Sequence, residues 1–139
     1  ISAMQGAEEV NLPPPILLGV TILTSWEEKQ FAEELSINQR IDVRANMLAE
    51  LAYNAGLGGC VCSPEEVENL RFNFPEPFQL ITPGIRFKDA NSEDQVRIST
   101  PLDALNSGSS RLVIGRPITK SENPKRAFNE FCRAIENVS

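Results

Sequence analysis

Histidine is absent from the 139 residues of the sequence. This absence excludes serine-histidine and cysteine-histidine nucleophile systems, the HExxH zinc helix and an imidazole general base. Any acid-base chemistry must therefore use Lys, Asp, Glu, Tyr or Cys. Cysteine is scarce as well, since Cys60, Cys62 and Cys132 are too few and too irregular for a disulfide framework and cannot complete a zinc site without histidine. We expect buried structural cysteines, no metal site and a reducing, cytoplasmic setting.

Basic residues are outnumbered, with 13 Lys and Arg against 19 Asp and Glu and a formal net charge of −6. Binding to a nucleic-acid backbone or an anionic membrane requires an excess of Lys and Arg on at least one face, so we expect neither partner. Long apolar runs are also missing. The longest, residues 16–23, falls far short of the roughly 20 residues that span a bilayer.

Strand and helix signals alternate along the chain. The apolar residues 16–23 predict a strand that is buried on both faces, as in a parallel sheet covered by helices. Residues 59–62, 79–82 and 111–114 predict three further strands. A short helix is expected within residues 26–35. A longer one is expected from Asp42 to an end at Gly56, with an apolar face made of Val43, Met47, Leu48, Leu51, Ala52 and Ala55.

Three polar residues that each precede a proline predict the starts of later helices. They are Ser63, Thr100 and Asn123. Repeated strand-helix units predict parallel βαβ connections with right-handed crossovers. A (β/α)8 TIM barrel of about 250 residues uses roughly 31 residues per unit, so the chain holds about four and a half units. The sequence therefore leaves two architectures open: a small doubly wound sheet, or the C-terminal half of a (β/α)8 TIM barrel.

Candidate ligand-binding residues directly follow the predicted strands, where active sites of parallel α/β folds collect. They are Thr24, Arg86, Gly115 and Arg116. Two arginines on one rim of an acidic protein favour an anionic small molecule. Gly115 permits close backbone approach, and the next residues could open a helical turn with N–H groups directed at a phosphate. An isolated arginine after a strand is also a common surface ion-pair partner, so Arg86 alone does not establish a site.

Residues 85–99 are polar and lack apolar periodicity. A segment of about fifteen residues without such periodicity is typical of functional loops. This segment suits a lid over a polar ligand, and the amide of Gln95 could contact a phosphate or a pyrimidine edge. The acidic pairs are interpreted as solvated helix faces or as first-turn carboxylates favoured by the helix dipole. These pairs are Glu27 with Glu28, Glu33 with Glu34, and Glu65 with Glu66.

Five segments, in this order and spacing, resemble the C-terminal half of bacterial orotidine 5′-monophosphate decarboxylase. They are residues 20–25 (VTILTS), 55–63 (AGLGGCVCS), 82–86 (TPGIR), 94–97 (DQVR) with the following Thr100-Pro101, and 113–119 (VIGRPIT). The resemblance implies a homodimeric (β/α)8 barrel that converts orotidine 5′-monophosphate to uridine 5′-monophosphate and CO2 without a metal or organic cofactor. Residues 1–139 would be the C-terminal part of that single domain, strands five to eight with their helices, and the N-terminal half would be absent.

The resemblance also implies a role for each candidate residue. Thr24 would contact the pyrimidine, Arg86 would contact the ligand, Gln95 would be the lid glutamine, and Gly115 and Arg116 would hold the phosphate of a nucleotide monophosphate. No catalytic residue is implied, because the Asp-x-Lys-x-x-Asp motif of the family does not occur in the sequence. This chain alone is therefore expected to be inactive.

Two other functions stay open at this point. The chain could be a non-catalytic half-barrel that binds phosphate or nucleotide, or part of a related sugar-phosphate synthase or isomerase. Residues 23–25 and the Asp94-Gln95 pair favour the decarboxylase over the sugar-phosphate enzymes. A half barrel would leave two sheet edges and an apolar interior exposed, so we expect pairing with an N-terminal half or with a second copy of the chain.

Overall fold

Four short strands form one parallel sheet in the computed structural model, which describes residues 2–87 and 97–136. Their bounds are β1 (Leu18–Val20), β2 (Gly59–Val61), β3 (Gln79–Thr82) and β4 (Arg111–Leu112), and their order in the sheet is β1-β2-β3-β4. Each strand pairs with its neighbour in sequence, and the order never reverses. A doubly wound sheet contains such a reversal, so the strand order favours the half barrel.

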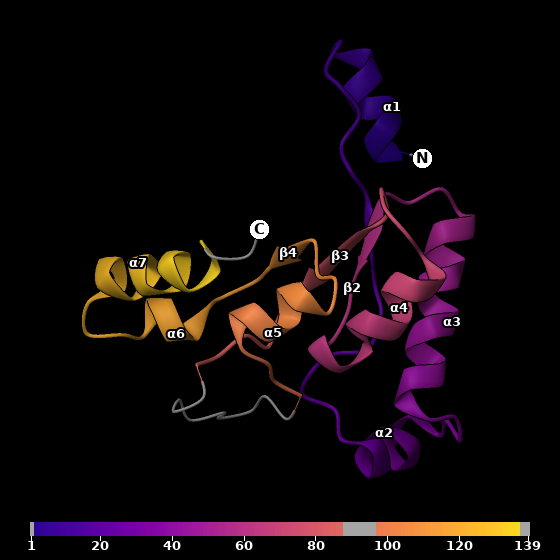
Figure 1. Ribbon diagram of the computed structural model, residues 1–139. Coiled ribbons are helices and arrows are strands. Elements are labelled where there is room, and N and C mark those ends of the chain that lie inside the picture. The colour runs from indigo at the N-terminus through magenta and orange to yellow at the C-terminus, as the bar shows by residue number, and fades with distance from the viewer. Residues whose placement is uncertain (1, 88–96, 137–139) are drawn as a thin grey trace.

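Helices connect the consecutive strands of the sheet (Figure 1). They are α2 (Glu28–Leu35) and α3 (Ile41–Asn54) after β1, the 3-10 helix η1 (Pro64–Glu66) and α4 (Val67–Asn73) after β2, α5 (Pro101–Asn106) after β3, and α6 (Arg116–Thr119) and α7 (Pro124–Ile135) after β4. Helix α1 (Ser2–Glu9) precedes β1, has no buried residue and stands apart from the sheet. No helix in the described parts of the chain is long and apolar enough to cross a membrane.

The predicted helix starts are confirmed by their capping hydrogen bonds. The side chain of Ser63 accepts from the backbone N–H of Glu65, and that of Thr100 accepts from Asp103. Asn123 Oδ1 accepts from the N–H of Arg126 at 3.0 Å. Each capping residue is followed by a proline, which fits the first turn because it has no N–H to leave unpaired.

One face of the sheet is covered by helices and holds the main core. Cys60 and Leu80 are paired neighbours on this face, and both are fully buried against residues of α3 and α4. Close approach is possible because a Cβ atom on Gly19 would lie only 2.9 Å from the Cβ of Ala52. The predicted burial of Cys60 and Cys62 is confirmed.

A second core lies under the C-terminal helices. Ile85, Ala104 and Phe131 are buried together, and Leu112 packs against them. The ring of Phe87 stacks on that of Phe131 with centroids 4.2 Å apart. Leu112 pairs with Thr82, which has the same orientation as Leu80, so this core lies on the same face of the sheet as the first.

The opposite face of the sheet is largely uncovered, and the prediction that the first strand is buried on both faces is wrong. Leu18 and Val20 of β1 are 40% and 61% exposed, and Val113 after β4 is 48% exposed. In a closed barrel this face would point into the interior, where side chains from all strands fill the space. Four strands alone cannot enclose it.

The predicted apolar face of the long helix is right for Ala52, which is buried, and wrong for its larger exposed members. Val43, Met47 and Leu51 lie on the outside of α3 and are 47%, 38% and 65% exposed. The buried residues of α3 are Ala52 and three that the prediction did not include, Ile41, Ala45 and Ala49. Small side chains face the sheet because the helix backbone approaches β1 closely. The larger side chains point away from the sheet and are exposed.

Arg71 of α4 ties together the segments that lead into β3 and β4. Its guanidinium donates to the carbonyl oxygens of Phe74, Phe78 and Gly108 at 3.1, 2.8 and 3.0 Å, and to the hydroxyl of Ser110 at 2.8 Å. Multiple donors on a rigid plane allow one arginine to satisfy several carbonyl groups at once. The amino ends of these two strands are therefore held by a single side chain.

Candidate functional site

The carboxyl ends of the four parallel strands meet at one edge of the sheet. Thr24 follows β1, Arg86 follows β3, and Gly115 and Arg116 follow β4, as the sequence predicts. Gln95, the fifth predicted site residue, lies outside the described residues. This edge is where parallel α/β folds bind their ligands.

Thr24 lies at a hollow of about 310 Å³ beside the ends of the first three strands. The residue is 6% exposed, and its carbonyl oxygen accepts from the backbone N–H of Arg97 at 3.3 Å. The hollow is lined by Val20, Ile22, Leu23, Thr24, Ser25, Val61, Cys62 and Pro83. Apolar walls with a few polar groups are typical of small-molecule sites in general.

Arg86 is buried, with 6% of the residue exposed, rather than a surface ion-pair partner. Its backbone N–H donates to the carbonyl of Ser99 at 3.0 Å, and its Nη1 donates to the carbonyl of Ile85 at 2.7 Å. Gly84, two residues earlier, has φ of +79°, a conformation that glycine adopts without a Cβ penalty. This turn directs the chain from β3 back along the rim.

Gly115 and Arg116 begin the short helix α6, which confirms the predicted helical turn. The carbonyl of Gly115 accepts from the N–H groups of Ile118 and Thr119 at 2.9 and 3.0 Å. A Cβ atom on Gly115 would have no heavy atom within 4 Å, so the space beside this residue is open. Arg116 is half-buried. Within the described residues, neither of them nor Arg86 lines the hollow beside Thr24.

Glu66 and Arg97 form a buried ion pair that sequence reasoning missed. Glu66 is 4% exposed and Arg97 is 6% exposed, and Arg97 Nη1 donates to Glu66 Oε1. Of the two interpretations of the Glu65-Glu66 pair, the first-turn position is confirmed for both residues, but a solvated face is wrong for Glu66, which is buried, whereas Glu65 beside it is exposed. Burial raises the pKa of the Glu66 carboxyl, and the charge of Arg97 and the N–H of Ser63 oppose that rise.

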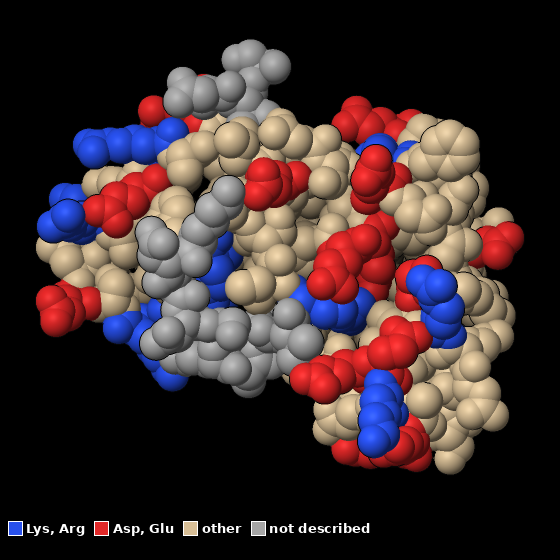
Figure 2. All heavy atoms as spheres, turned by 60° about the horizontal axis from the view of Figure 1, so that its bottom comes forward, with Lys and Arg blue, Asp and Glu red and all other residues tan. Residues whose placement is uncertain are grey.

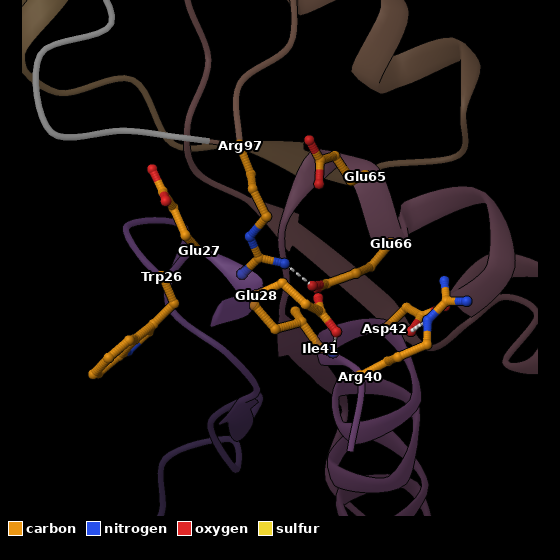
Figure 3. Close-up of a pocket in the computed structure, with 9 residues that line it drawn as sticks. All are labelled: Trp26, Glu27, Glu28, Arg40, Ile41, Asp42, Glu65, Glu66 and Arg97. Carbon is orange, nitrogen blue, oxygen red and sulfur yellow. Dashed lines mark hydrogen bonds and ion pairs between the residues drawn. The ribbon is translucent and has the colours of Figure 1, made fainter. Parts of the chain in front are cut away.

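The pair borders a second hollow of about 430 Å³, shown in Figure 3. Its lining residues are Trp26, Glu27, Glu28, Arg40, Ile41, Asp42, Glu65, Glu66 and Arg97. The guanidinium of Arg40 donates to both carboxylate oxygens of Asp42 at 3.0 and 2.9 Å, and Glu28 Oε1 accepts from the N–H of Ile41 at 3.0 Å. Acidic side chains crowd the part of this face around α2 (Figure 2). Of the carboxylates that line this hollow, Glu28, Asp42 and Glu66 accept hydrogen bonds within the fold.

Among residues 2–87 and 97–136, no three His, Cys, Asp or Glu side chains are placed so that they could hold a metal ion together. Buried cysteines fit this picture, since Cys60 and Cys62 pack in the main core. Mutual hydrogen bonding and burial raise the pKa of the Cys62 thiol, which keeps it protonated and unreactive.

Strand order, a single layer of helices and basic residues on the carboxyl rim together define half of a parallel (β/α)8 barrel. The family model described as "Orotidine 5'-phosphate decarboxylase / HUMPS family" matches residues 1–131. The chain belongs to this family, which confirms the resemblance found in its five segments.

Curated relatives carry the same description. The orotidine 5'-phosphate decarboxylase of one Prochlorococcus marinus strain is 61% identical over 134 residues, which are 96% of this chain and 56% of the relative. The orotidine 5'-phosphate decarboxylase of Synechococcus sp. (strain CC9902) is 52% identical over 134 residues, 96% of this chain and 55% of the relative. The chain spans about half the length of the curated relatives it matches.

Solved structures confirm the fold. A crystal structure of orotidine 5'-phosphate decarboxylase from Lactobacillus acidophilus is 34% identical with a TM-score of 0.73, and the match covers 90% of this chain and 51% of that one. The crystal structure of orotidine 5'-monophosphate decarboxylase from Methanocaldococcus jannaschii, complexed with the inhibitor BMP, is 17% identical with a TM-score of 0.59. That match covers 96% of this chain and 54% of the other. At that identity the second likeness concerns the fold alone.

Proposed function

We propose that this chain is the nucleotide-binding half of an orotidine 5′-monophosphate decarboxylase, which converts orotidine 5′-monophosphate to uridine 5′-monophosphate and CO2. The observation that carries the proposal is the rim itself. Thr24, Arg86 and the Gly115-Arg116 pair follow three strands of one parallel sheet, in a chain 61% identical to a named decarboxylase. The curated relatives named above are decarboxylases, which favours this activity over a sugar-phosphate synthase or isomerase.

Each residue of the rim has a distinct role in the proposal. Thr24 contacts the pyrimidine in the apolar hollow, and Gly115 and Arg116 hold the phosphate. Arg86 contributes a further ligand contact, and Gln95 contacts the ligand from the segment between β3 and α5. Binding energy from a phosphate remote from the reacting carbon can be used to orient the pyrimidine, and an arginine-phosphate contact is of the strong, charge-assisted kind.

The chain supplies no catalytic residue in this proposal. A lysine that protonates the developing carbanion and an aspartate beside the leaving carboxylate would come from an N-terminal half, because the Asp-x-Lys-x-x-Asp motif does not occur in this sequence. No metal or organic cofactor is needed. By itself the chain is expected to bind phosphate weakly and to leave orotidine 5′-monophosphate unchanged.

Two exposed apolar surfaces support pairing with an N-terminal half. One is the uncovered sheet face with Leu18, Val20 and Val113, and the other is the outer face of α3 with Met47 and Leu51. Burying apolar area contributes about 25 cal/mol per Å². A completed barrel would cover the sheet face with the remaining strands and the outer face of α3 with a neighbouring helix. We expect the completed barrel to be a cytoplasmic homodimer.

The test is to join this chain to the N-terminal half of the Prochlorococcus relative, giving a protein called here the assembled barrel. The expected result is decarboxylation of orotidine 5′-monophosphate by the assembled barrel and none by either half alone. Binding of uridine 5′-monophosphate without turnover would favour a non-catalytic nucleotide-binding role instead. A stable, compact monomer of this chain alone, measured by light scattering, would contradict the need for a partner.

A further inference from the structure

Arg97 is the centre of a hydrogen-bond network that joins segments following two strands. Its Nη2 donates to the carbonyl oxygens of Leu23 and Ile22 at 2.9 and 3.4 Å, and its backbone N–H donates to the carbonyl of Thr24 at 3.3 Å. Three consecutive carbonyl groups after β1 therefore accept from one residue. Only 7% of the Arg97 side chain is exposed, so water competes little for these bonds.

Glu66 fixes the other end of the guanidinium. One of its carboxylate oxygens accepts from Arg97 Nη1, and the other accepts from the backbone N–H of Ser63 at 3.0 Å. Ser63 is fully buried at the end of the segment that follows β2. Glu66 thus completes a capping box and at the same time anchors Arg97, as Figure 3 shows for the ion pair. The segments after β1 and β2 are linked through two side chains.

A buried ion pair is weak evidence for a role in stability, because taking both charges out of water costs about as much as their attraction returns. An apolar pair of similar size would fill the same volume. What such a pair could not do is donate side-chain hydrogen bonds to the carbonyls of Ile22 and Leu23, which directly precede Thr24. The feature that requires an arginine is therefore the placement of the backbone around Thr24.

We propose that Arg97 is a positioning residue for the pyrimidine side of the site, with Glu66 as its anchor. Arg97 holds residues 22–24 so that Thr24 lies at the edge of the apolar hollow beside β1, β2 and β3. The proposal rests on the proposed function, since it assigns the pyrimidine to that hollow. It separates two parts of the rim: Arg97 acts on the base, and Gly115 and Arg116 act on the phosphate.

Lysine cannot replace Arg97 in this role. The guanidinium bridges Glu66 on one nitrogen and the carbonyl of Leu23 on another, whereas an ammonium group concentrates its three donors at one point. The variant Arg97→Lys keeps the charge opposite Glu66 but gives up the reach to the carbonyls. It should therefore show weakened binding of the base even where the ion pair survives.

The experiment compares two ligands on the assembled barrel by calorimetry. Uridine 5′-monophosphate carries both base and phosphate, and ribose 5-phosphate carries only the phosphate part. Arg97→Met is expected to weaken the binding of uridine 5′-monophosphate roughly tenfold, which corresponds to about 1.4 kcal/mol. The affinity for ribose 5-phosphate is expected to stay within about twofold of the parent value. The matched control is Arg126→Met, which breaks an exposed ion pair with Glu130 on α7 and should change neither ligand.

A double variant separates positioning from folding. Glu66→Leu with Arg97→Met replaces the buried pair by apolar side chains and is expected to restore thermal stability lost in Arg97→Met alone. If Arg97 positions Thr24, the restored protein still binds uridine 5′-monophosphate about tenfold more weakly than the parent. Recovery of full affinity together with stability would overturn the proposal, because the pair would then only fill space.

The remaining outcomes are distinguishable from a failure of the proposed function. Equal weakening of both ligands in the double variant, or unchanged uridine 5′-monophosphate binding in Arg97→Met, overturns the positioning role while leaving the decarboxylase assignment intact. Failure of the parent assembled barrel to bind uridine 5′-monophosphate at all, with the protein folded, overturns the proposed function and this inference with it.

Discussion

Arg71 and Arg97 hold opposite ends of the same sheet. Arg71 donates to carbonyls that precede β3 and β4, including those of Phe78 and Gly108. Arg97 donates to carbonyls that follow β1, including that of Leu23, and reaches a carboxylate near the end of β2. Both arginines donate to several backbone groups at once, but Arg71 does so at the amino ends of the strands and Arg97 does so at their carboxyl ends.

The difference between the two ends follows from what each end does in a parallel α/β fold. The amino ends of the strands contribute to stability, whereas ligand-binding residues gather at the carboxyl ends. Arg71 therefore acts on the fold, and Arg97 is expected to act on the ligand. Substitutions at the two ends should separate stability from affinity.

The largest effect is expected at the amino end. Arg71→Met removes the arginine's hydrogen bonds to three carbonyls and to the hydroxyl of Ser110, and should lower the free energy of unfolding by about 2–4 kcal/mol. Urea denaturation of the assembled barrel measures the loss, with Arg126→Met as the exposed control. The affinity of the remaining folded protein for uridine 5′-monophosphate should be unchanged. A loss of affinity for uridine 5′-monophosphate in Arg71→Met, without a loss of stability, would contradict the assignment of stability to the amino ends and ligand binding to the carboxyl ends.

A smaller effect, on ligand rather than on fold, is expected after β4. Arg116→Ala removes the proposed phosphate contact and should weaken binding of uridine 5′-monophosphate by about 1.5–3 kcal/mol, or roughly ten- to a hundredfold. Binding of uridine, which has no phosphate, should change little. Competition titrations on the assembled barrel compare the two ligands, and an equal loss for both would contradict the role assigned to Arg116.

The smallest effect is a pH dependence of stability from Glu66. Because burial raises the pKa of this carboxyl in the folded protein, the folded state binds the proton more tightly than the unfolded state does. The free energy of unfolding, relative to Glu66→Gln, should fall as the pH rises from about 4.3, the usual value for glutamate, through the raised folded pKa. Below that window the difference should be constant.

Urea denaturation of the parent and of Glu66→Gln at several pH values measures this dependence. In the background of Arg97→Met the fall should extend to higher pH, since the opposing positive charge has been removed. A difference between parent and Glu66→Gln that grows with pH would show that the attraction of Arg97 outweighs the burial of Glu66.

Local chemistry is the part of the fold that the sequence predicted well. Ser63, Thr100 and Asn123 cap helices as expected, because an N-cap depends on neighbours only a few residues away. Gly56 has φ of +76° after α3, as its position at the helix end predicted. Thr24, Arg86 and Arg116 fall at the carboxyl edge because strand direction alone decides that placement.

Long-range packing decides what the sequence could not predict. The apolar periodicity of α3 contains two candidate faces, and only the close approach of β1 selects the alanines over Val43 and Met47. Glu66 and Arg97 are 31 residues apart, so the sequence around either residue does not predict their contact. Glu66 was recognisable as a member of a capping box, but its burial depends on a partner that arrives from beyond β3.

Trp26, the single tryptophan of the chain, borders the same hollow as Arg97 and Glu66. It lies two residues after Thr24 and meets the ring of Phe31 edge-on, with centroids 6.2 Å apart. The one tryptophan fluorophore of this chain therefore lies in the connection between β1 and α2. Its fluorescence emission therefore reports on the conformation of this loop, without an added label and before any substrate is bound.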